Sequence, residues 1–339
     1  MEMSSLGNKK QIPVMLKEVL AEFDDYLINI NNNFDNPAII LDLTLGDAGH
    51  SYNLLRIAKS KLKDFRLVSL DWDIASINYV LRNFSTEISR FIKCDINCDN
   101  IHISSLHTNN KWDVIQSNFL WVDKLFEKIN YSKAFFVIAD LGVSSRQLLA
   151  KNRGFSYKNP SILDMRMAKE YQEVIASDIL NAFSKKELRN LFVRTIGLSK
   201  DLASYIANKI IKARLEKPFG DKDDVKRLSI ISYDLKYKNL GKFGYFKYNP
   251  TTLLLLALRI AVNSELENLF NIWSKLKNIV LQNARVIFLG FHSAEWEILE
   301  TVPQLYNFEL KKVLAVSSKE KAQNKRARSA KMFVFEYHE

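Results

Sequence analysis

Residues 135–148 read FFVIADLGVSSRQL, an apolar run that ends in an acid and is followed by a glycine turn and two serines. An apolar run of this length predicts a buried strand. A carboxylate at the carboxyl end of a buried strand faces the crevice in which open α/β sheets hold ligands. We therefore predict that Asp140 is the catalytic residue.

The composition excludes several broad classes of protein. The chain has 339 residues, of which 47% are apolar, so it can bury a large core as one extended domain or two. Its two cysteines, Cys94 and Cys98, can build neither a disulfide framework nor a four-ligand zinc site, and we interpret them as buried thiols in a reducing compartment. The longest apolar run, Leu253 to Leu258, is too short to span a bilayer. We predict a cytoplasmic protein without metal or membrane contact.

The positive charge is unevenly distributed. The formal net charge is +11, and much of the excess lies between Lys185 and Arg227 and in the segment SKEKAQNKRARSAK, residues 318–331. Basic faces attract polyanions in a salt-sensitive way. Because lysine is abundant throughout, charge alone leaves nucleic-acid binding and solvated surfaces as equal alternatives.

Short apolar runs alternate with amphipathic stretches over the first 145 residues, which predicts a βαβ pattern. The expected strands are 38–43, 65–70, 91–94, 134–139, 285–290, 308–316 and 331–337, and the expected helices include 51–63, 73–84 and 253–269. Strands nearly vanish from 152 to 250, where helical spacing takes over. We predict an α/β, Rossmann-like domain made of residues 1–150 and 251–339, with an inserted helical substrate-recognition domain at 151–250.

The turn after the first expected strand indicates a cofactor. Gly46 to Gly49 join this strand to a helix, and backbone N–H groups at a helix start suit a carboxylate or phosphate. Asp71 closes the next strand, where an acid can accept hydrogen bonds from ribose hydroxyls. The turn lacks the glycines of a pyrophosphate site, and Asp47 would repel one, so S-adenosylmethionine fits better than a nicotinamide dinucleotide.

Nine segments along the chain resemble one known family. They are PVMLKEVL, DLTLGDAGHS, SLDWD, DLGVSSRQL, RGFSY, LDMRM, ALRIAVNSEL, GFHSAE and NKRARSAK, which span Pro13 to Lys331. The set is similar to the bacterial 16S ribosomal RNA (cytosine-N4)-methyltransferase family, also called MraW or RsmH. The resemblance implies a class I methyltransferase domain with an inserted helical domain, S-adenosylmethionine as donor, and a cytidine in the decoding region of 16S rRNA as acceptor. It leaves the oligomeric state open, with a homodimer as one alternative.

The resemblance also implies a set of cofactor contacts. They fall on Gly46, Ala48, Gly49, His50, Asp71, Cys98, Asp140 and Gln147. Ala48 stands where the family has glycine, and because alanine disfavours a positive φ we expect either a backbone that avoids it or a slightly displaced loop. Cys98 stands where the family commonly has an aromatic beside the adenine, which predicts weaker cofactor affinity because a thiol lacks a stacking face.

Further departures from the family lie on the substrate side. Leu43 replaces a glycine, while Leu253 and Leu256 replace an arginine and a glutamine. These changes keep open a catalytically weakened rRNA-binding assembly factor of the same fold.

The acceptor side is predicted from the chemistry of cytosine N4, whose lone pair is delocalised into the ring. Asp140 would accept an N4–H hydrogen bond and offset the developing positive charge. The residues that we assign to the RNA substrate are Ser144, Ser145, Arg146, Arg153, Lys325, Arg326 and Arg328. Helix capping explains Ser144 and Ser145 equally well. Arg153 can instead form one salt-bridged scaffold with Asp164 and Arg166, a role we favour over direct catalysis.

Overall fold

The computed structural model describes residues 12–29, 37–158, 160–233 and 249–339. Its centre is one sheet with the strand order β4-β3-β5-β2-β1-β6-β7-β9-β8. The strands are β1 (Ala38–Asp42), β2 (Phe65–Asp71), β3 (Ile88–Cys94), β4 (Ile101–Ser105), β5 (Trp112–Gln116), β6 (Ala134–Asp140), β7 (Val280–Gly290), β8 (Phe308–Ala315) and β9 (Lys331–Tyr337). The six strands from β3 to β7 in this order, β3, β5, β2, β1, β6 and β7, run parallel to one another. Strand β4 is antiparallel to β3, and β9 is antiparallel to both β7 and β8.

This order identifies a doubly wound, class I Rossmann-like fold, as the sequence predicted. The chain moves outward from β1 through β2 on one side and from β6 through β7 on the other, so the order reverses between β1 and β6. Ligands of such sheets bind at this reversal, outside the carboxyl ends of the strands.

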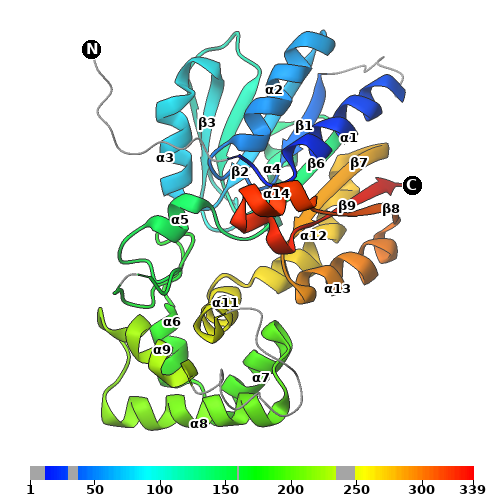
Figure 1. Cartoon of the computed structure of the whole chain (residues 1–339). Coiled ribbons are helices and arrows are strands. Elements are labelled where there is room, and N and C mark those ends of the chain that lie inside the picture. The colour runs from blue at the N-terminus through cyan, green and yellow to red at the C-terminus, as the bar shows by residue number, and fades with distance from the viewer. Residues whose placement is uncertain (1–11, 30–36, 159, 234–248) are drawn as a thin grey trace.

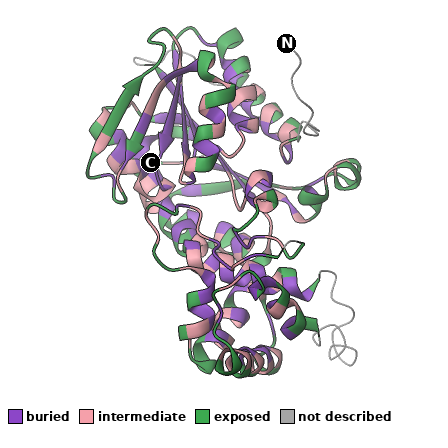
Figure 2. Ribbon diagram, turned by 90° about the vertical axis from the view of Figure 1, so that its left-hand side faces the viewer, coloured by how far each residue is buried: buried purple, intermediate pink, exposed green. Residues whose placement is uncertain are grey.

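Helices cover both faces of the sheet. One face packs on α1 (Leu16–Asn29), α2 (Gly49–Lys61) and α3 (Ile74–Asn83), and the other on α4 (Val122–Ile129), α12 (Glu265–Ile279) and α13 (Ser293–Thr301). The strands between these layers are buried on both sides, as the near-continuous apolar sequences of β1 and β6 require. Figure 2 shows the middle of the sheet as buried, whereas the marginal strands β4 and β8 are largely exposed.

The helical part lies at one end of the sheet domain (Figure 1). It contains α6 (Ala176–Ala182), α7 (Lys185–Ile196), α8 (Lys200–Glu216), α9 (Asp224–Tyr233) and α11 (Pro250–Asn263), and the short α5 (Ser145–Leu149) leads toward it. Its hydrophobic cluster is separate from the two clusters of the sheet. Leu254 and Leu258 of α11 belong to it, so the helical core takes side chains from beyond the expected boundary at residue 250. The expected domain includes residues 234–248, which lie outside the described residues.

One expected helix is wrong. The stretch 253–269 is two helices, α11 and α12, because Ser264 adopts a left-handed conformation with φ 50° and interrupts the helix. Arg259 of α11 reaches across the break to Glu265, with Nε–Oε1 and Nη2–Oε2 distances of 2.8 Å. The break places Asn263 and Glu265 at the edge of a cavity instead of along one helical face.

The third expected strand, β3, is not hydrogen-bonded to β2. Strand β5, which the sequence did not predict, lies against β2, and β3 is one place further out. Strands β3 and β4 form an antiparallel hairpin that extends the margin of the sheet. This difference changes which loop follows the strand beside β2.

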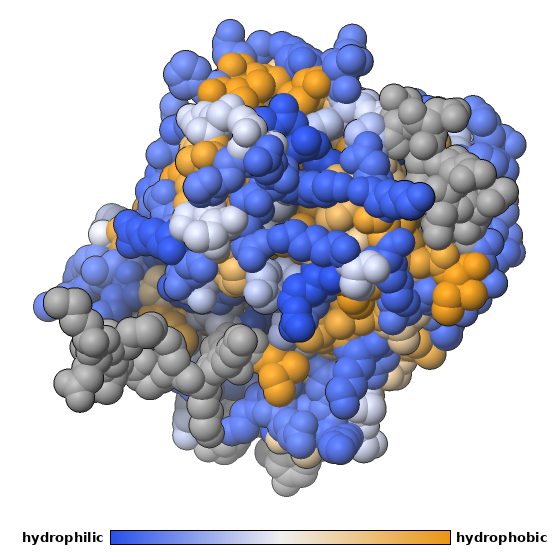
Figure 3. All heavy atoms as spheres, turned by 90° about the horizontal axis from the view of Figure 1, so that it is seen from above, coloured by the Kyte–Doolittle hydropathy of each residue, from blue (hydrophilic) through white to orange (hydrophobic). Residues whose placement is uncertain are grey.

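The end of the molecule opposite the helical part is predominantly hydrophilic. Figure 3 shows this face, on which apolar residues form separate patches between charged and polar ones. Across the described ranges, none of the helices is both long and apolar enough to cross a bilayer.

Candidate active site

A cavity opens where the strand order reverses. It is bordered by the loops after β1 and β6, by the end of β2, by the loop after β5 and by the joint between α11 and α12. Of the predicted site residues, it is lined by Gly46, Gly49, His50, Asp71, Asp140, Ser144, Ser145, Gln147 and Arg326. The structure therefore brings these nine residues together, although they come from four separate stretches of the sequence.

The turn after β1 depends on a close contact. A side chain at Gly49 would place its Cβ 2.2 Å from Pro13 Cγ, so only glycine fits there. Ala48 lies behind the turn, fully buried, with φ 64°. Of the two alternatives, a backbone that avoids positive φ is excluded: the turn keeps the left-handed conformation and accepts an alanine, at a cost of about 1–2 kcal/mol.

The last residue of β2, Asp71, is an acid whose carboxylate accepts two main-chain hydrogen bonds. Asp71 accepts hydrogen bonds from the backbone N–H of Gly46 at 2.8 Å and of Asp73 at 2.8 Å. Burial, followed by repulsion from Asp73, raises the pKa of Asp71 to about 7. The acid thus ties the first turn to the end of β2 and borders the cavity, where the predicted ribose contact requires it.

Asp140 is different because one of its carboxylate oxygens has no partner among the described residues. Its backbone N–H donates to Thr44 Oγ1 at 2.6 Å, which fixes the end of β6 beside the loop after β1. Within the described chain, its buried Oδ1 has no hydrogen-bond partner, and Oδ2 lies 3.7 Å from His50 Nε2. Both ring nitrogens of His50 are likewise buried without a hydrogen bond. Unsatisfied buried polar atoms are uncommon, and in a cavity they indicate a ligand.

The serines after Asp140 cap a helix. Ser144 and Gln147 form a reciprocal capping box at α5, with Ser144 N–H to Gln147 Oε1 at 2.8 Å and Gln147 N–H to Ser144 Oγ at 3.3 Å. The capping alternative is thus correct for Ser144. Gln147 also donates from Nε2 to Asp73 Oδ2 at 2.7 Å, so its side chain links α5 to the end of β2.

Cys98 does not border the cavity, which corrects the sequence assignment. It is fully buried in the turn of the β3–β4 hairpin, where its Sγ lies 3.1 Å from Ser117 Oγ. Because β5 is the strand beside β2, the loop that borders the cavity is the one after β5, with Ser117, Asn118 and Phe119. Phe119 supplies an aromatic ring to this loop. The lack of a stacking face at Cys98 is therefore no longer a reason to expect weak cofactor affinity.

Two further residues escaped the sequence analysis. Trp72 lines the cavity between Asp71 and Asp73. Asp73 is 2% exposed, caps α3 by accepting from Ala75 N–H at 3.0 Å, and binds Gln147 and Arg153. The signal was present in SLDWD, because an acid that precedes a helix after a strand is a typical cap.

Several predicted RNA contacts are occupied by protein partners. Arg146 does not line the cavity; its Nε lies 3.2 Å from Asp47 Oδ1 and its guanidinium 3.6 Å from the centre of the Tyr79 ring. Arg326 lines the cavity and donates to Ser145 Oγ and to the carbonyl of Val143 at 2.7 Å.

Lys325 and Arg328 lie away from the cavity lining. Both side chains are exposed in the short helix Lys325–Ser329. Their position leaves them accessible to a polyanion outside the cavity, and their assignment to RNA stays a prediction.

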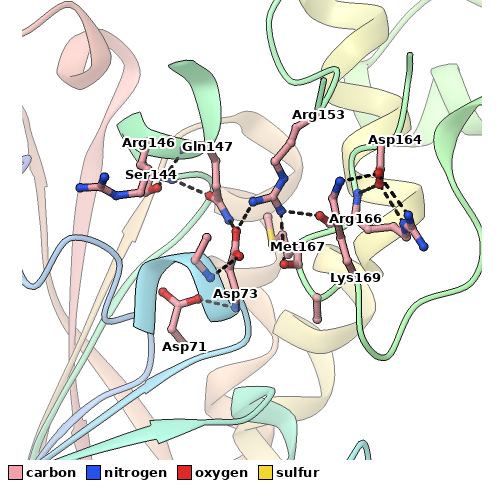
Figure 4. A network of polar contacts seen from close by, with 12 residues as sticks. Asp71, Asp73, Ser144, Arg146, Gln147, Arg153, Asp164, Arg166, Met167 and Lys169 are labelled. Atoms are coloured by element: carbon pink, nitrogen blue, oxygen red, sulfur yellow. Dashed lines mark hydrogen bonds and ion pairs between the residues drawn. The ribbon is translucent and has the colours of Figure 1, made fainter. Parts of the chain in front are cut away.

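Arg153 is a buried structural residue and does not line the cavity, which corrects its assignment to the substrate. Its side chain is 10% exposed, and Nη1 lies 2.6 Å from Asp73 Oδ2 (Figure 4). The expected single scaffold is two separate clusters: Arg153 pairs with Asp73, whereas Asp164 binds both Arg166 and Lys169, each at 2.8 Å. Main-chain atoms join the two clusters: Arg153 Nη2 donates to the carbonyl of Arg166 at 2.6 Å.

Residues 8–338 match the profile of the MraW methylase family. The chain belongs to this family. It is 33% identical over 346 residues to the "Ribosomal RNA small subunit methyltransferase H" of Campylobacter concisus, covering 96% of this chain and 97% of that protein. Proteins of the same name from Prochlorococcus marinus (31% over 334 residues, 97% and 96%) and Pseudothermotoga lettingae (28% over 328 residues, 96% and 98%) are also similar.

Among solved structures, an rRNA methylase from Streptococcus thermophilus is similar over 94% of this chain and 96% of its own, with 8% identity and a TM-score of 0.39. That likeness is too distant to support a functional conclusion. Membership of the methylase family confirms the cofactor expected from the sequence, S-adenosylmethionine.

The residues of the cavity fit this cofactor. The start of α2 could offer backbone N–H groups to the carboxylate of the cofactor, Asp71 could accept from its hydroxyl groups, and Asp140 would stand near its cationic sulfonium. Among the described residues no cluster of histidine, cysteine or acidic side chains could hold a metal ion.

Proposed function

We propose that this protein methylates the exocyclic N4 of a cytidine in the decoding region of 16S rRNA, with S-adenosylmethionine as the methyl donor. The substrate class follows the names of its relatives, which are small-subunit rRNA methyltransferases over nearly their full length. The observation that carries the chemistry is the Oδ1 atom of Asp140, which is buried at the cavity and has no hydrogen bond to any residue that the structure describes.

The chemistry requires a group that prepares the amine. The N4 lone pair is delocalised into the ring, so the amine is a poor nucleophile, whereas the bound cofactor supplies an electrophilic methyl group. Asp140 accepts an N4–H hydrogen bond, which favours a more tetrahedral nitrogen and offsets its developing positive charge. The carboxylate need not be strongly basic, because the nitrogen becomes acidic as it is methylated.

The fixed environment of Asp140 favours this role. Its backbone is held by Thr44 and its Oδ2 faces His50, so the free Oδ1 keeps one direction. A preorganised acceptor costs no reorganisation during the reaction, which is the usual source of electrostatic catalysis.

The donor is held by the residues at the ends of β1 and β2. Gly46, Gly49 and His50 border its amino-acid end, Asp71 accepts from the ribose, and Phe119 with Trp72 forms walls beside the base. The acceptor base must leave its stack to reach this cavity.

Lys325 and Arg328 are the proposed contacts to RNA phosphates. Both are exposed and lie in the same short helix as Arg326, which borders the cavity. Replacing both with glutamine should weaken RNA binding and reduce the slope of log affinity against log salt by about 2. An unchanged slope would place the RNA elsewhere.

The decisive experiment compares rRNA nucleosides by mass spectrometry from cells with and without this protein. We expect N4-methylated cytidine in 16S rRNA to disappear with the protein and to return with the wild-type chain but not with Asp140→Asn. If the nucleoside persists without the protein, the assignment fails.

The alternative function for a protein of this fold is that of a catalytically weakened, rRNA-binding assembly factor. Such a protein would not need a buried carboxylate oxygen without a partner, and Asp140, Asp71 and His50 are all present at the cavity. Incorporation of labelled methyl groups into small ribosomal subunits in vitro distinguishes the two.

A further inference from the structure

Asp73 is a buried carboxylate just after β2, and it binds both Gln147 and Arg153. Its backbone N–H donates to Asp71 Oδ1 at 2.8 Å, and its Oδ1 caps α3. Its Oδ2 receives Gln147 Nε2 at 2.7 Å and Arg153 Nη1 at 2.6 Å (Figure 4). Asp73 therefore holds two residues of the donor side, Asp71 through the main chain and Gln147 through the side chain.

Arg153 extends these contacts toward the helical part. The second arm of its guanidinium, Nη2, donates to the carbonyls of Arg166 at 2.6 Å and Met167 at 3.3 Å. Met167 lines the cavity, and its N–H donates to Asn263 Oδ1 at 2.9 Å, at the end of α11. One guanidinium thus joins the end of β2 to the segment that forms the opposite wall.

We propose that the Asp73–Arg153 ion pair is a positioning pair that couples donor binding to the shape of the acceptor wall. The donor part concerns Asp71 and Gln147, which Asp73 holds in place. The acceptor part rests on the proposed function, because it assumes that RNA binds against the wall formed by Met167 and Asn263. Neither Asp73 nor Arg153 touches the reacting atoms.

The planar fork of arginine is central to this role. Nη1 and Nη2 bind the carboxylate and the carbonyls at the same time, in a fixed relative geometry. A lysine could keep the charge beside Asp73, but one ammonium group on a flexible stem could not hold both partners in that geometry. Arg153→Lys therefore separates charge compensation from coupling.

The chain offers a matched control in Glu22 of α1. Glu22 is 7% exposed, lies 3.2 Å from Arg285 Nη1 and 2.5 Å from Lys312 Nζ, and does not line the cavity. Glu22→Gln removes a buried, arginine-paired carboxylate just as Asp73→Asn does. Loss of stability alone would affect both variants alike.

The first test is titration calorimetry with S-adenosylhomocysteine, on full-length variants whose folding is checked by circular dichroism. Asp73→Asn should bind about tenfold more weakly than wild type, because charged hydrogen bonds that hold Gln147 are weakened. Glu22→Gln should bind within about twofold. Equal affinities for Asp73→Asn and wild type, or an equal loss in Glu22→Gln, would overturn the donor part.

The second test measures S-adenosylhomocysteine affinity with and without small ribosomal subunits purified from cells that lack this protein. The wild type and Glu22→Gln should gain about fivefold or more in affinity when subunits are present. Arg153→Lys should bind the free ligand nearly as well as wild type but gain less than twofold. A full gain in Arg153→Lys, or none in wild type, would refute the coupling.

A failure of this inference can be distinguished from a failure of the proposed function. If cells without the protein keep N4-methylated cytidine, the acceptor assignment fails and the coupling loses its meaning. The difference in donor affinity between Asp73→Asn and Glu22→Gln would still decide whether Asp73 positions the cofactor side.

Discussion

The strands β2 and β6 both end in acids at the same edge of the sheet, but their surroundings differ. At the end of β2, Asp71 and Asp73 accept hydrogen bonds from main-chain and side-chain donors of the protein itself. At the end of β6, Asp140 leaves Oδ1 without any partner among the described residues and Oδ2 opposite His50. A satisfied carboxylate organises the site, whereas an unsatisfied one is available to a reacting group.

The largest effect is expected at Asp140. Asp140→Asn keeps the size of the side chain, so we expect the fold and S-adenosylhomocysteine affinity to stay near wild type. Methyl transfer to small subunits should fall by a factor of about 10² to 10⁴, because the amide cannot offset the developing charge. The measurement is incorporation of labelled methyl under single-turnover conditions. Near-normal transfer would remove the distinction between the two strand ends.

The next largest effect concerns the loop after β5. Phe119→Ala should weaken S-adenosylhomocysteine binding about tenfold, because stacking on a base contributes about 1–3 kcal/mol. Cys98→Ala, in the hairpin outside the cavity, should bind within about twofold of wild type. Titration calorimetry checks both variants, and the reverse order would restore Cys98 as the neighbour of the adenine.

The pH dependence tests the end of β2 directly. The pKa of Asp71 is raised to about 7, so its carboxyl group ionises between pH 6 and 8. Because an ionised carboxylate accepts hydroxyl hydrogen bonds more strongly, donor affinity should rise with pH by up to about tenfold over this window. Asp71→Asn should abolish this rise. A flat profile in the wild type would count against the ribose contact.

The same shift has the opposite sign for stability. The folded state holds a proton on Asp71 that the unfolded chain has lost, so its free energy of unfolding decreases as pH rises from about 4 to about 7. Chemical denaturation across this window, with Asp71→Asn as reference, measures the contribution.

The smallest effect is expected at Ala48. Ala48→Gly relieves a positive φ that costs about 1–2 kcal/mol, but it loses a buried methyl group worth about 0.8 kcal/mol and gains chain entropy in the unfolded state. The free energy of unfolding should therefore change by less than about 1 kcal/mol, and donor affinity by less than about twofold. A large gain in affinity would mean that the alanine distorts the donor side.

The sequence predicted the residues that end central strands. A run such as FFVIAD is continuously apolar because its strand is buried on both faces. The run therefore predicts the strand, and the acid at its end predicts which edge of the sheet the carboxylate occupies. The sequence could not show which strand lies beside β2, because Ile88–Cys94 and Trp112–Gln116 are both short strands of mixed apolar and polar residues and chain order does not fix lateral order. The resemblance to the family placed Cys98 beside the adenine, and without the lateral order the sequence could not test that placement.

The ion-pair partner of Arg153 could not be predicted from the sequence either. Arg153, Asp164 and Arg166 lie close in sequence, which favoured a local scaffold, whereas Arg153 pairs with Asp73, 80 residues earlier. Tertiary packing decides such pairs, and periodicity carries no information about them.

The contact between Thr44 and the backbone of Asp140 has a consequence for motion. It fastens the strand that carries the acid to the strand that carries the donor turn, at the edge where both end. We therefore expect the acid and the donor loop to move together. The adjustment to an incoming nucleotide would then fall to the helical part.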